Sequence, residues 1–152
     1  MKRLVALLGA ASIAASSVVA CTPKPVSAEP VAEQFLEDME TRNNEELAAL
    51  IDEPSTATST LDATFAGLQA EGLDVELTGV EQEDARATAH YSVTWTLPRD
   101  RTLRYDTSMA LTRKDKEWTV RWQPSIVHPD LGAHQHLELR SIAPKRAGVV
   151  SS

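Results

Sequence analysis

The chain has 152 residues, with 15 Lys and Arg against 22 Asp and Glu, and its formal net charge is −7. No basic stripe of the kind that neutralises phosphates occurs in it, which excludes the usual signature of a nucleic-acid-binding protein. With one cysteine and 42% apolar residues, the composition suits a single domain held by an ordinary core without disulfides.

The first twenty residues have the pattern of a secretory signal peptide. Lys2 and Arg3 precede an uncharged run from Leu4 to Ala20, and the only cysteine, Cys21, follows directly. A charged start, a short apolar run and a small residue before the cleavage point are typical of such peptides. The run Val18 to Cys21 resembles a lipobox, so we expect the peptide to be removed and Cys21 to be lipidated.

Lipid on Cys21 would anchor the chain to the cell membrane, because two acyl chains hold a protein stably where one does not. The alternative is a transmembrane helix, but Gly9 and several serines make the run a short and weak candidate. The expected location is the outer face of the cytoplasmic membrane. Loss of Lys2 and Arg3 leaves 13 basic against 22 acidic side chains, a formal net charge of −9.

A Pro-rich polar segment follows the anchor. Residues 21–30 end in TPKPVSAEP, a composition typical of an extended, semi-rigid linker. In polyproline geometry, at about 3.1 Å per residue, its last nine residues would span roughly 28 Å. We therefore expect a tether between the lipid and the folded domain.

An amphipathic helix is expected after the tether, with Pro30 at its first position. The apolar positions on one face are Val31, Phe35, Leu36 and Met39, and the acidic positions expected in solvent are Glu33, Glu37, Asp38 and Glu40. Such an acidic face is usually only solvated, so the sequence does not indicate a calcium site there.

Two more helices are expected before residue 73. Asn43 and Glu46 have the spacing of a capping pair, and a short helix should end before Pro54. A third helix should begin near Ser55 and stop at Gly72, which can take the left-handed conformation that closes a helix.

From Leu73 onward the apolar period changes to two, which indicates strands. The first strand is expected at 73–77, broken by Gly79 and a polar turn at 81–84. Longer alternating segments follow at 87–97, 103–111 and 118–122, separated by short polar turns. Three helices followed by a four-stranded antiparallel meander predict an α+β layer architecture in which the helices cover one face of a curved sheet.

This order resembles the cone-shaped NTF2-like fold, and the block WTVRWQPSIVHPDL, residues 118–131, resembles the closing motif of one family. That family is the NTF2-like N-terminal transpeptidase domain, the MecA-type extension of class B penicillin-binding lipoproteins. The motif residues are Trp118, Trp122, Pro124, Ser125, His128 and Pro129. The resemblance implies an NTF2-like domain at residues 31–128 and, at 129–152, an exit segment that leads toward a pedestal domain.

In the resembling enzymes a later serine transpeptidase domain takes the acyl group of β-lactams. That chemistry needs a Ser-x-x-Lys nucleophile motif and a Lys-Thr-Gly motif. Neither occurs in these 152 residues. The resemblance therefore implies a role as spacer or interaction module for a cell-wall transpeptidase, in peptidoglycan synthesis and the β-lactam response, without transpeptidase activity in this chain.

The motif residues have a plain structural reading. Trp118 and Trp122 lie on one face of a strand, which indicates core packing. The less favoured interpretation is that one tryptophan lines a pocket at the cone mouth. Pro124 then ends ladder pairing. Ser125 and His128 suggest a nucleophile and a base, but an extended, Pro-bounded segment would not bring the two side chains together, and no orienting acid is evident. Pro129 instead favours a fixed exit direction.

No metal or cofactor is expected. Four side chains that could ligate zinc fall within nine residues: His128, Asp130, His134 and His136. Their spacing matches no known zinc site and the region is loop-like, so exposed, solvated histidines are the favoured interpretation.

The cone interior should be filled with side chains. Enzymes on this fold use a buried carboxyl, imidazole or phenol whose pKa is shifted by desolvation. Here only Tyr91 and Tyr105 bring polarity to the expected inner face, while His90 and Asp106 alternate outward. The sequence therefore favours a domain that is not an enzyme.

Three hypotheses stay open: the lipid-anchored spacer, a standalone ligand-binding protein or small cone-pocket enzyme on the same fold, and a truncated gene product. A polar cavity with an ionisable side chain would favour the second, and a downstream Ser-x-x-Lys in the reading frame the third. We also expect residues 131–152 not to fold alone, because Leu137, Leu139 and Ile142 alternate like a strand without a partner.

Overall fold

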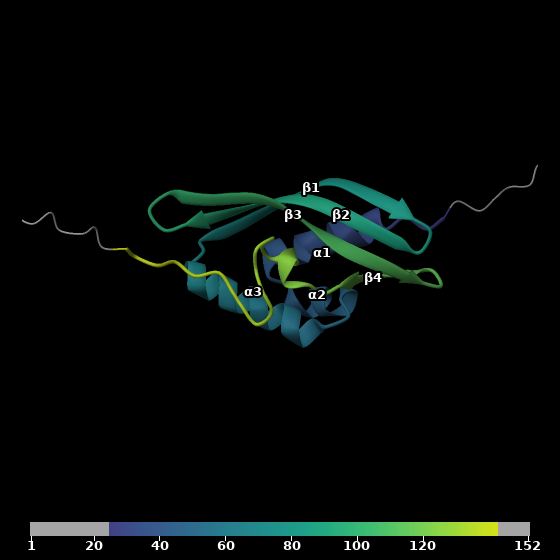
Figure 1. Ribbon diagram of the computed structural model, residues 1–152, viewed down its shortest axis with the longest axis horizontal. Coiled ribbons are helices and arrows are strands. Elements are labelled where there is room, and N and C mark those ends of the chain that lie inside the picture. The colour runs from purple at the N-terminus through teal and green to yellow at the C-terminus, as the bar shows by residue number, and fades with distance from the viewer. Residues whose placement is uncertain (1–24, 143–152) are drawn as a thin grey trace, which may run out of the picture.

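The computed structural model describes residues 25–142 as three helices on one face of a four-stranded antiparallel sheet (Figure 1). The expected α+β architecture is confirmed. The expected signal peptide, Cys21 and the start of the tether lie outside the described residues, as does the end of the exit segment at 143–152.

The helices are α1 (Glu29–Thr41), α2 (Asn44–Leu50) and α3 (Pro54–Leu68). α1 has a proline in its first turn, where the missing N–H removes no helical hydrogen bond. The expected capping pair does not form, since the Asn43 side chain makes no cap hydrogen bond. α3 ends earlier than expected, at Gln69 in the left-handed region (φ 52°) rather than at Gly72, because the N–H groups of Gln69 and Ala70 already bond to the last turn.

The strands are β1 (Gly72–Glu83), β2 (Arg86–Leu97), β3 (Arg101–Lys114) and β4 (Glu117–Arg121), and they pair in sequence order. β1 is longer than the sequence indicated. Gly79 does not break it but follows a bulge at Thr78, where the register with β2 shifts between Leu77 and Gly79. The extra residue places Val80 and Gln82 on the partly buried face that Leu73, Val75 and Leu77 occupy before it, so β1 continues to Glu83.

One core lies between the sheet and the helices. The inner face of β2 alternates as the sequence predicts, with Tyr91 and Trp95 among the largest fully buried side chains. Phe65 of α3 packs edge-on against Trp95, with ring centroids 4.9 Å apart. Asp38 does not lie on a solvated face as expected: it is only 2% exposed, because this position of α1 turns toward the molecule.

The edge of the sheet at β4 is covered by the connection between α2 and α3. Ile51 forms a parallel bridge with Val120, and the Asp52 N–H donates to the Val120 carbonyl at 3.1 Å. The Asp52 carboxylate then accepts the Trp122 N–H at 2.7 Å. These bonds end pairing at β4 and direct the chain into the short 3₁₀ helix η1 (Pro124–Ile126).

The segment after η1 returns over α3, so its described part, residues 131–142, differs from our expectation that residues 131–152 do not fold alone. The Leu139 N–H donates to the Gly67 carbonyl at 2.9 Å, and Leu137 and Leu139 are half-buried against the core. The alternation of these leucines therefore serves packing on a helix rather than strand pairing. Ile142, at 89% exposure, stands clear of the fold.

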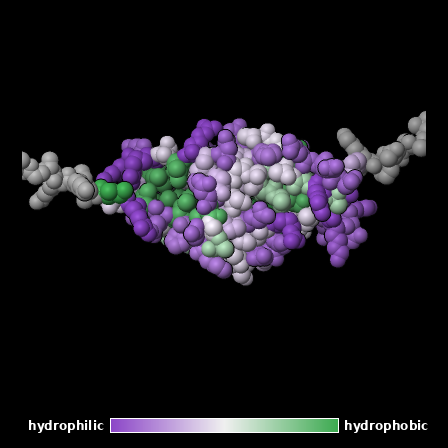
Figure 2. Space-filling model, viewed as in Figure 1, coloured by the Kyte–Doolittle hydropathy of each residue, from purple (hydrophilic) through white to green (hydrophobic). Residues whose placement is uncertain are grey.

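The two ends of the described chain lie at opposite ends of the long axis (Figure 1). α1 begins at the end where the β1–β2 and β3–β4 turns lie, and the C-terminal segment leaves beside the β2–β3 turn. Hydrophilic residues cover most of the face in Figure 2, and the larger apolar area lies next to the C-terminal end of the described chain.

Candidate functional site

The cone between the sheet and α3 is where this architecture could hold a ligand, and its polar side chains come from β2 and β3. Tyr91 is fully buried and its hydroxyl donates to the Ile126 carbonyl at 2.7 Å. The Trp95 indole N–H donates to the Tyr105 hydroxyl at 2.8 Å, and that hydroxyl donates to the Val127 carbonyl. Every one of these polar groups has a partner within the chain.

The cone is closed by the chain's own segment around η1. Ile126 and Val127 are buried, with 0% and 2% exposure. Three successive carbonyls of this segment accept side-chain hydroxyls: Ser125 from Thr107, Ile126 from Tyr91 and Val127 from Tyr105. We name residues 125–127 the plug.

The electrostatics of the cone do not favour proton transfer. Burial raises the pKa of Tyr91 well above its ordinary value of 10, and burial raises that of Tyr105 to about 12. Both phenols are therefore neutral at physiological pH and act as hydrogen-bond donors. A general base needs a pKa near the working pH and access to a substrate proton, and neither phenol offers both.

The motif residues at the end of the sheet occupy structural positions. Trp118 is buried on the inner face of β4, and Trp122 is half-buried at its end. The Trp118 indole N–H donates to the Val26 carbonyl at 2.9 Å. Pro124 begins η1, where its missing N–H removes no bond of the turn.

Ser125 and His128 are separated by a 3₁₀ turn and not by the extended segment that the sequence indicated. His128 packs against Tyr105, with ring centroids 4.5 Å apart, and its Nδ1 accepts the Asp130 N–H at 3.2 Å. No hydrogen bond joins Ser125 to His128 among the described residues. Pro129 is exposed and follows directly.

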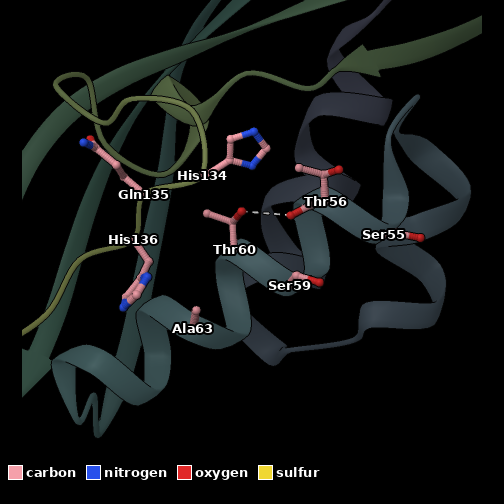
Figure 3. A pocket seen from close by; sticks show the side chains of 8 residues that line it. All are labelled: Ser55, Thr56, Ser59, Thr60, Ala63, His134, Gln135 and His136. Carbon is pink, nitrogen blue, oxygen red and sulfur yellow. Dashed lines mark hydrogen bonds between the residues drawn. The ribbon is translucent and has the colours of Figure 1, made fainter.

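A polar groove lies between the first half of α3 and the segment after η1 (Figure 3). Its volume is about 460 Å³, and it is lined by Ser55, Thr56, Ser59, Thr60, Ala63, His134, Gln135 and His136. The Thr60 hydroxyl is occupied by the Thr56 carbonyl at 2.9 Å, and the Gln135 side-chain oxygen by the Gly132 N–H at 2.7 Å. Both histidines are exposed.

The four candidate zinc ligands are not gathered into a site. Within residues 25–142, no three His, Cys, Asp or Glu side chains are placed to hold a metal ion. His134 and His136 line the groove, whereas His128 faces Tyr105 and its Nδ1 is already an acceptor. The groove therefore has hydroxyl and imidazole groups but no assembled metal or catalytic centre.

An open groove of about 520 Å³ lies between α1 and β1, and most of its lining side chains are glutamates. Burial raises the pKa of Glu40, and Asp74 beside it raises that pKa further. Asp38 lies on another side of α1, where Oδ1 accepts the Gln34 amide at 3.1 Å and Oδ2 has no partner among the described residues. A lone buried carboxylate without a cavity does not form a site.

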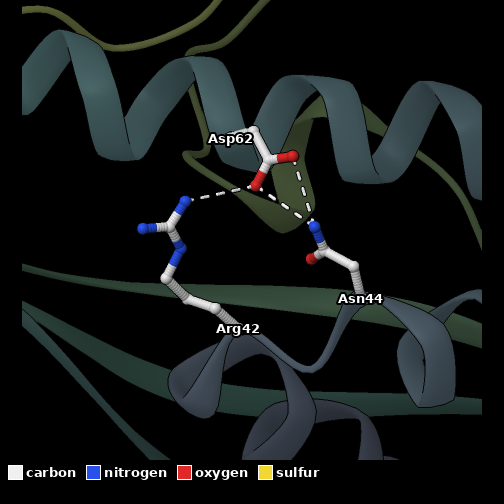
Figure 4. Close-up of polar contacts among 3 residues, drawn as sticks. All are labelled: Arg42, Asn44 and Asp62. Atoms are coloured by element: carbon white, nitrogen blue, oxygen red, sulfur yellow. Dashed lines mark hydrogen bonds and ion pairs between the residues drawn. The ribbon is translucent and has the colours of Figure 1, made fainter.

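A polar contact that the sequence did not indicate joins the α1–α2 corner to α3 (Figure 4). Arg42 pairs with Asp62 at 3.4 Å, and the Asn44 amide donates to both Asp62 oxygens at 3.2 Å. The Arg42 guanidinium also lies 4.5 Å from the centre of the Phe65 ring. Arg42 and Asp62 are half-exposed, so we expect the pair to contribute little to stability.

Comparison with known proteins identifies the architecture. The family model described as the NTF2-like N-terminal transpeptidase domain matches residues 27–135, more than half of the chain. No match was found among curated proteins. No helix within residues 25–142 has both the length and the apolar character needed to cross a bilayer.

Solved structures similar to this one share its fold at low sequence identity. The structure described as "Rd1NTF2_04 with long sheet" is 14% identical with a TM-score of 0.54, covering 62% of this chain and 98% of that one. A hypothetical protein with a ketosteroid isomerase-like fold from Catenulispora acidiphila, in complex with trimethylamine, is 10% identical with a TM-score of 0.51, covering 66% and 92%. Bd1075 of Bdellovibrio bacteriovorus is 10% identical with a TM-score of 0.50, covering 61% and 38%.

Proposed function

Because the chain belongs to the family of NTF2-like N-terminal transpeptidase domains, we propose that it is a non-enzymatic, lipid-anchored spacer or interaction domain of a penicillin-binding protein. In this role it works at the outer face of the cytoplasmic membrane, with Cys21 as the lipidated residue. Its partner is a cell-wall transpeptidase, either as a separate protein or as a continuation of the same polypeptide.

The observation that supports a spacer best is the placement of the two chain ends at opposite ends of the long axis (Figure 1). A domain inserted between a membrane anchor and a partner adds its full length only when the chain enters at one end and leaves at the other. A domain with adjacent termini would hold its partner hardly any farther from the membrane than the anchor alone does.

The filled cone supports a role without catalysis. The plug carbonyls accept the hydroxyls of Tyr91, Tyr105 and Thr107, so these three polar groups are bonded within the chain rather than free for a substrate. This fold is also not that of a transpeptidase domain, and neither nucleophile motif occurs in the sequence. The ligand-binding alternative needs an open polar cavity, and the groove with His134 and His136 is the one described feature in its favour. Two polar groups of that groove, on Thr60 and Gln135, are already bonded within the chain.

The test is made on the native product in membranes of the source cells. We expect lipid on Cys21, detected by intact mass and by incorporation of a labelled fatty acid, and we expect Cys21→Ser to remove the label. The conservative Ser27→Ala variant serves as the matched control. A native chain without lipid, or a Cys21→Ser chain that still takes the label, would refute Cys21 as the anchor.

Labelling of the same membranes with fluorescent penicillin tests the link to transpeptidases. A lipidated band near the mass of this chain that takes no penicillin, yet crosslinks to a penicillin-labelled protein, supports a separate interaction domain. A larger labelled band with this N-terminal sequence supports a spacer within one polypeptide. A lipidated chain that meets no penicillin-labelled protein in either form would refute the proposed partner.

A further inference from the structure

We infer that the domain is a rigid spacer, which we call the strut: hydrogen bonds hold the chain where it enters the domain and where it leaves it, and one sheet connects these two sets of contacts. This inference deepens the proposed function, since it assigns the height of the spacer to the folded domain and a positioning role to the polar side chains of the cone. It depends on two sets of contacts, at Val26 and Ala28 near the N-terminus and at the plug and α3 near the C-terminus.

At the N-terminal side, two side chains hold the backbone before α1. The Val26 carbonyl accepts both the Trp118 indole N–H at 2.9 Å and the Gln82 amide at 3.2 Å. The Gln82 side-chain oxygen accepts the Ala28 N–H at 2.9 Å, and Ala28 is fully buried. Gln82 thus bonds to Val26 and Ala28 as a neighbouring strand would. We name Val26, Ala28, Gln82 and Trp118 the N-terminal contacts.

These contacts shorten the tether that the sequence indicated. Residues 26–30 belong to the fold, since α1 begins at Glu29 and Val26 is already bonded to β1 and β4. Five residue steps then separate Cys21 from Val26, and at about 3.1 Å per residue they span about 16 Å at most in polyproline geometry. The Pro-rich segment supplies little height.

At the C-terminal side, the cone itself holds the chain. Successive plug carbonyls accept the hydroxyls of Thr107, Tyr91 and Tyr105, and Ile126 and Val127 fill the space beneath them. The buried hydroxyls therefore act as positioning residues for the C-terminal segment.

The same segment is fastened again on α3. The Leu139 N–H donates to the Gly67 carbonyl at 2.9 Å, and the Leu137 N–H points at the buried Thr64 hydroxyl at 3.4 Å. The approach is close: a Cβ on Gly67 would lie 2.4 Å from the Leu137 carbonyl oxygen. Since that oxygen belongs to the backbone, only glycine allows this path. We name Thr64, Gly67, Leu137 and Leu139 the C-terminal contacts.

One sheet carries both sets of contacts. Gln82 and Trp118 lie on β1 and β4, while Tyr91, Tyr105 and Thr107 lie on β2 and β3. β3 has 14 residues and, at about 3.3 Å per residue, spans about 45 Å. It runs from the turn beside the C-terminal segment to the turn beside the N-terminal contacts (Figure 1), so this length approximates the height that the strut provides.

The experiment measures the distance between the two chain ends in solution. The full chain with Cys21→Ser, which removes its only native thiol, receives Pro25→Cys and Ser141→Cys for spin labels, and pulsed electron double resonance gives the distance distribution. We expect one narrow distribution centred at about 45 Å. A reference pair within the fold, Ser59→Cys and Thr102→Cys, gives the width that a rigid body produces.

Gly67→Ala is the decisive variant and Gly79→Ala its matched control, because a Cβ on Gly79 meets nothing within 4 Å. If Gly67→Ala releases the chain as far as Val127, about fourteen flexible residues precede the label, with a root-mean-square span of about 20 Å. We expect that broadening for Gly67→Ala and the parent width for Gly79→Ala. Trp118→Phe keeps an aromatic ring in the core but removes the donor to Val26, and should broaden the distribution from the other end.

A parent distribution much broader than that of the reference pair would overturn the strut, and so would a Gly67→Ala distribution as narrow as the parent's in a protein whose circular dichroism shows it folded. Lipidation of the native chain is scored separately. A narrow distribution in the spin-labelled chain, together with a native Cys21 chain that carries no lipid, refutes the anchor alone. A broad distribution in the spin-labelled chain, together with a lipidated native chain, refutes the strut alone.

Discussion

Removal of the Tyr91 hydroxyl should destabilise the domain measurably, although Tyr91→Phe deletes a single atom. The hydroxyl donates to the Ile126 carbonyl at 2.7 Å, and both side chains are 0% exposed. In Tyr91→Phe that carbonyl stays buried without its donor, which costs about 1–3 kcal/mol. With a loss of about 2 kcal/mol and an m value of about 1.5 kcal/mol per molar urea, the unfolding midpoint falls by about 1.3 M.

The assay is urea unfolding followed by tryptophan fluorescence, with Thr102→Val as the matched control, since Thr102 is an exposed hydroxyl on the same sheet. We expect the m value to stay unchanged and the control midpoint to stay within about 0.3 M of the parent. If Tyr91→Phe unfolds at the parent midpoint, the Ile126 carbonyl has another partner or the plug leaves the cone readily. Either result contradicts the role assigned to the hydroxyls.

Three further outcomes are expected. Burial raises the pKa of Tyr105 to about 12, so the contribution of Tyr105 to the free energy of unfolding should be complete below pH 10 and lost between pH 10 and about 12. Tyr105→Phe should weaken that alkaline loss, which pH-jump unfolding measures. Burial and the nearby Asp74 raise the pKa of Glu40, so its ionisation opposes folding above its ordinary pKa of 4.5. Glu40→Gln should therefore raise the urea midpoint at pH 7 and lose that advantage at pH 4. An equal gain at both pH values would contradict the assignment. Asp62→Ala should cost less than about 1 kcal/mol in thermal unfolding, because the Arg42–Asp62 pair is half-exposed, whereas a loss well above that would mean the pair is essential to helix packing.

The sequence determined the layers and their order. Period-two alternation over residues 87–97 identified β2 and its buried face, because successive side chains of a strand point to opposite sides. The spacing of Phe35, Leu36 and Met39 identified the buried face of α1 in the same way. These patterns are local, and each is enforced by the one core that all the elements share.

The element ends were less accessible to sequence reasoning. Gly72 looked like a helix stop, but the backbone N–H groups after α3 close the helix on Gln69 and leave Gly72 to begin β1. Gly79 looked like a strand break, yet a bulge lets β1 continue. Both outcomes depend on which hydrogen-bond partners lie nearby, and those partners come from elsewhere in the chain.

Only the tertiary structure decided the state of the cone and the paths of the two chain ends. Tyr91 and Tyr105 could be recognised from sequence as the polar residues of the inner face, but their acceptors lie on residues 126 and 127, which the alternation pattern does not reach. Gln82 and Trp118 hold Val26 across separations of 56 and 92 residues. Periodicity reports which face of an element is buried, whereas a hydrogen bond between distant segments exists only once folding has brought them together, and those bonds fix where this chain enters and leaves its domain.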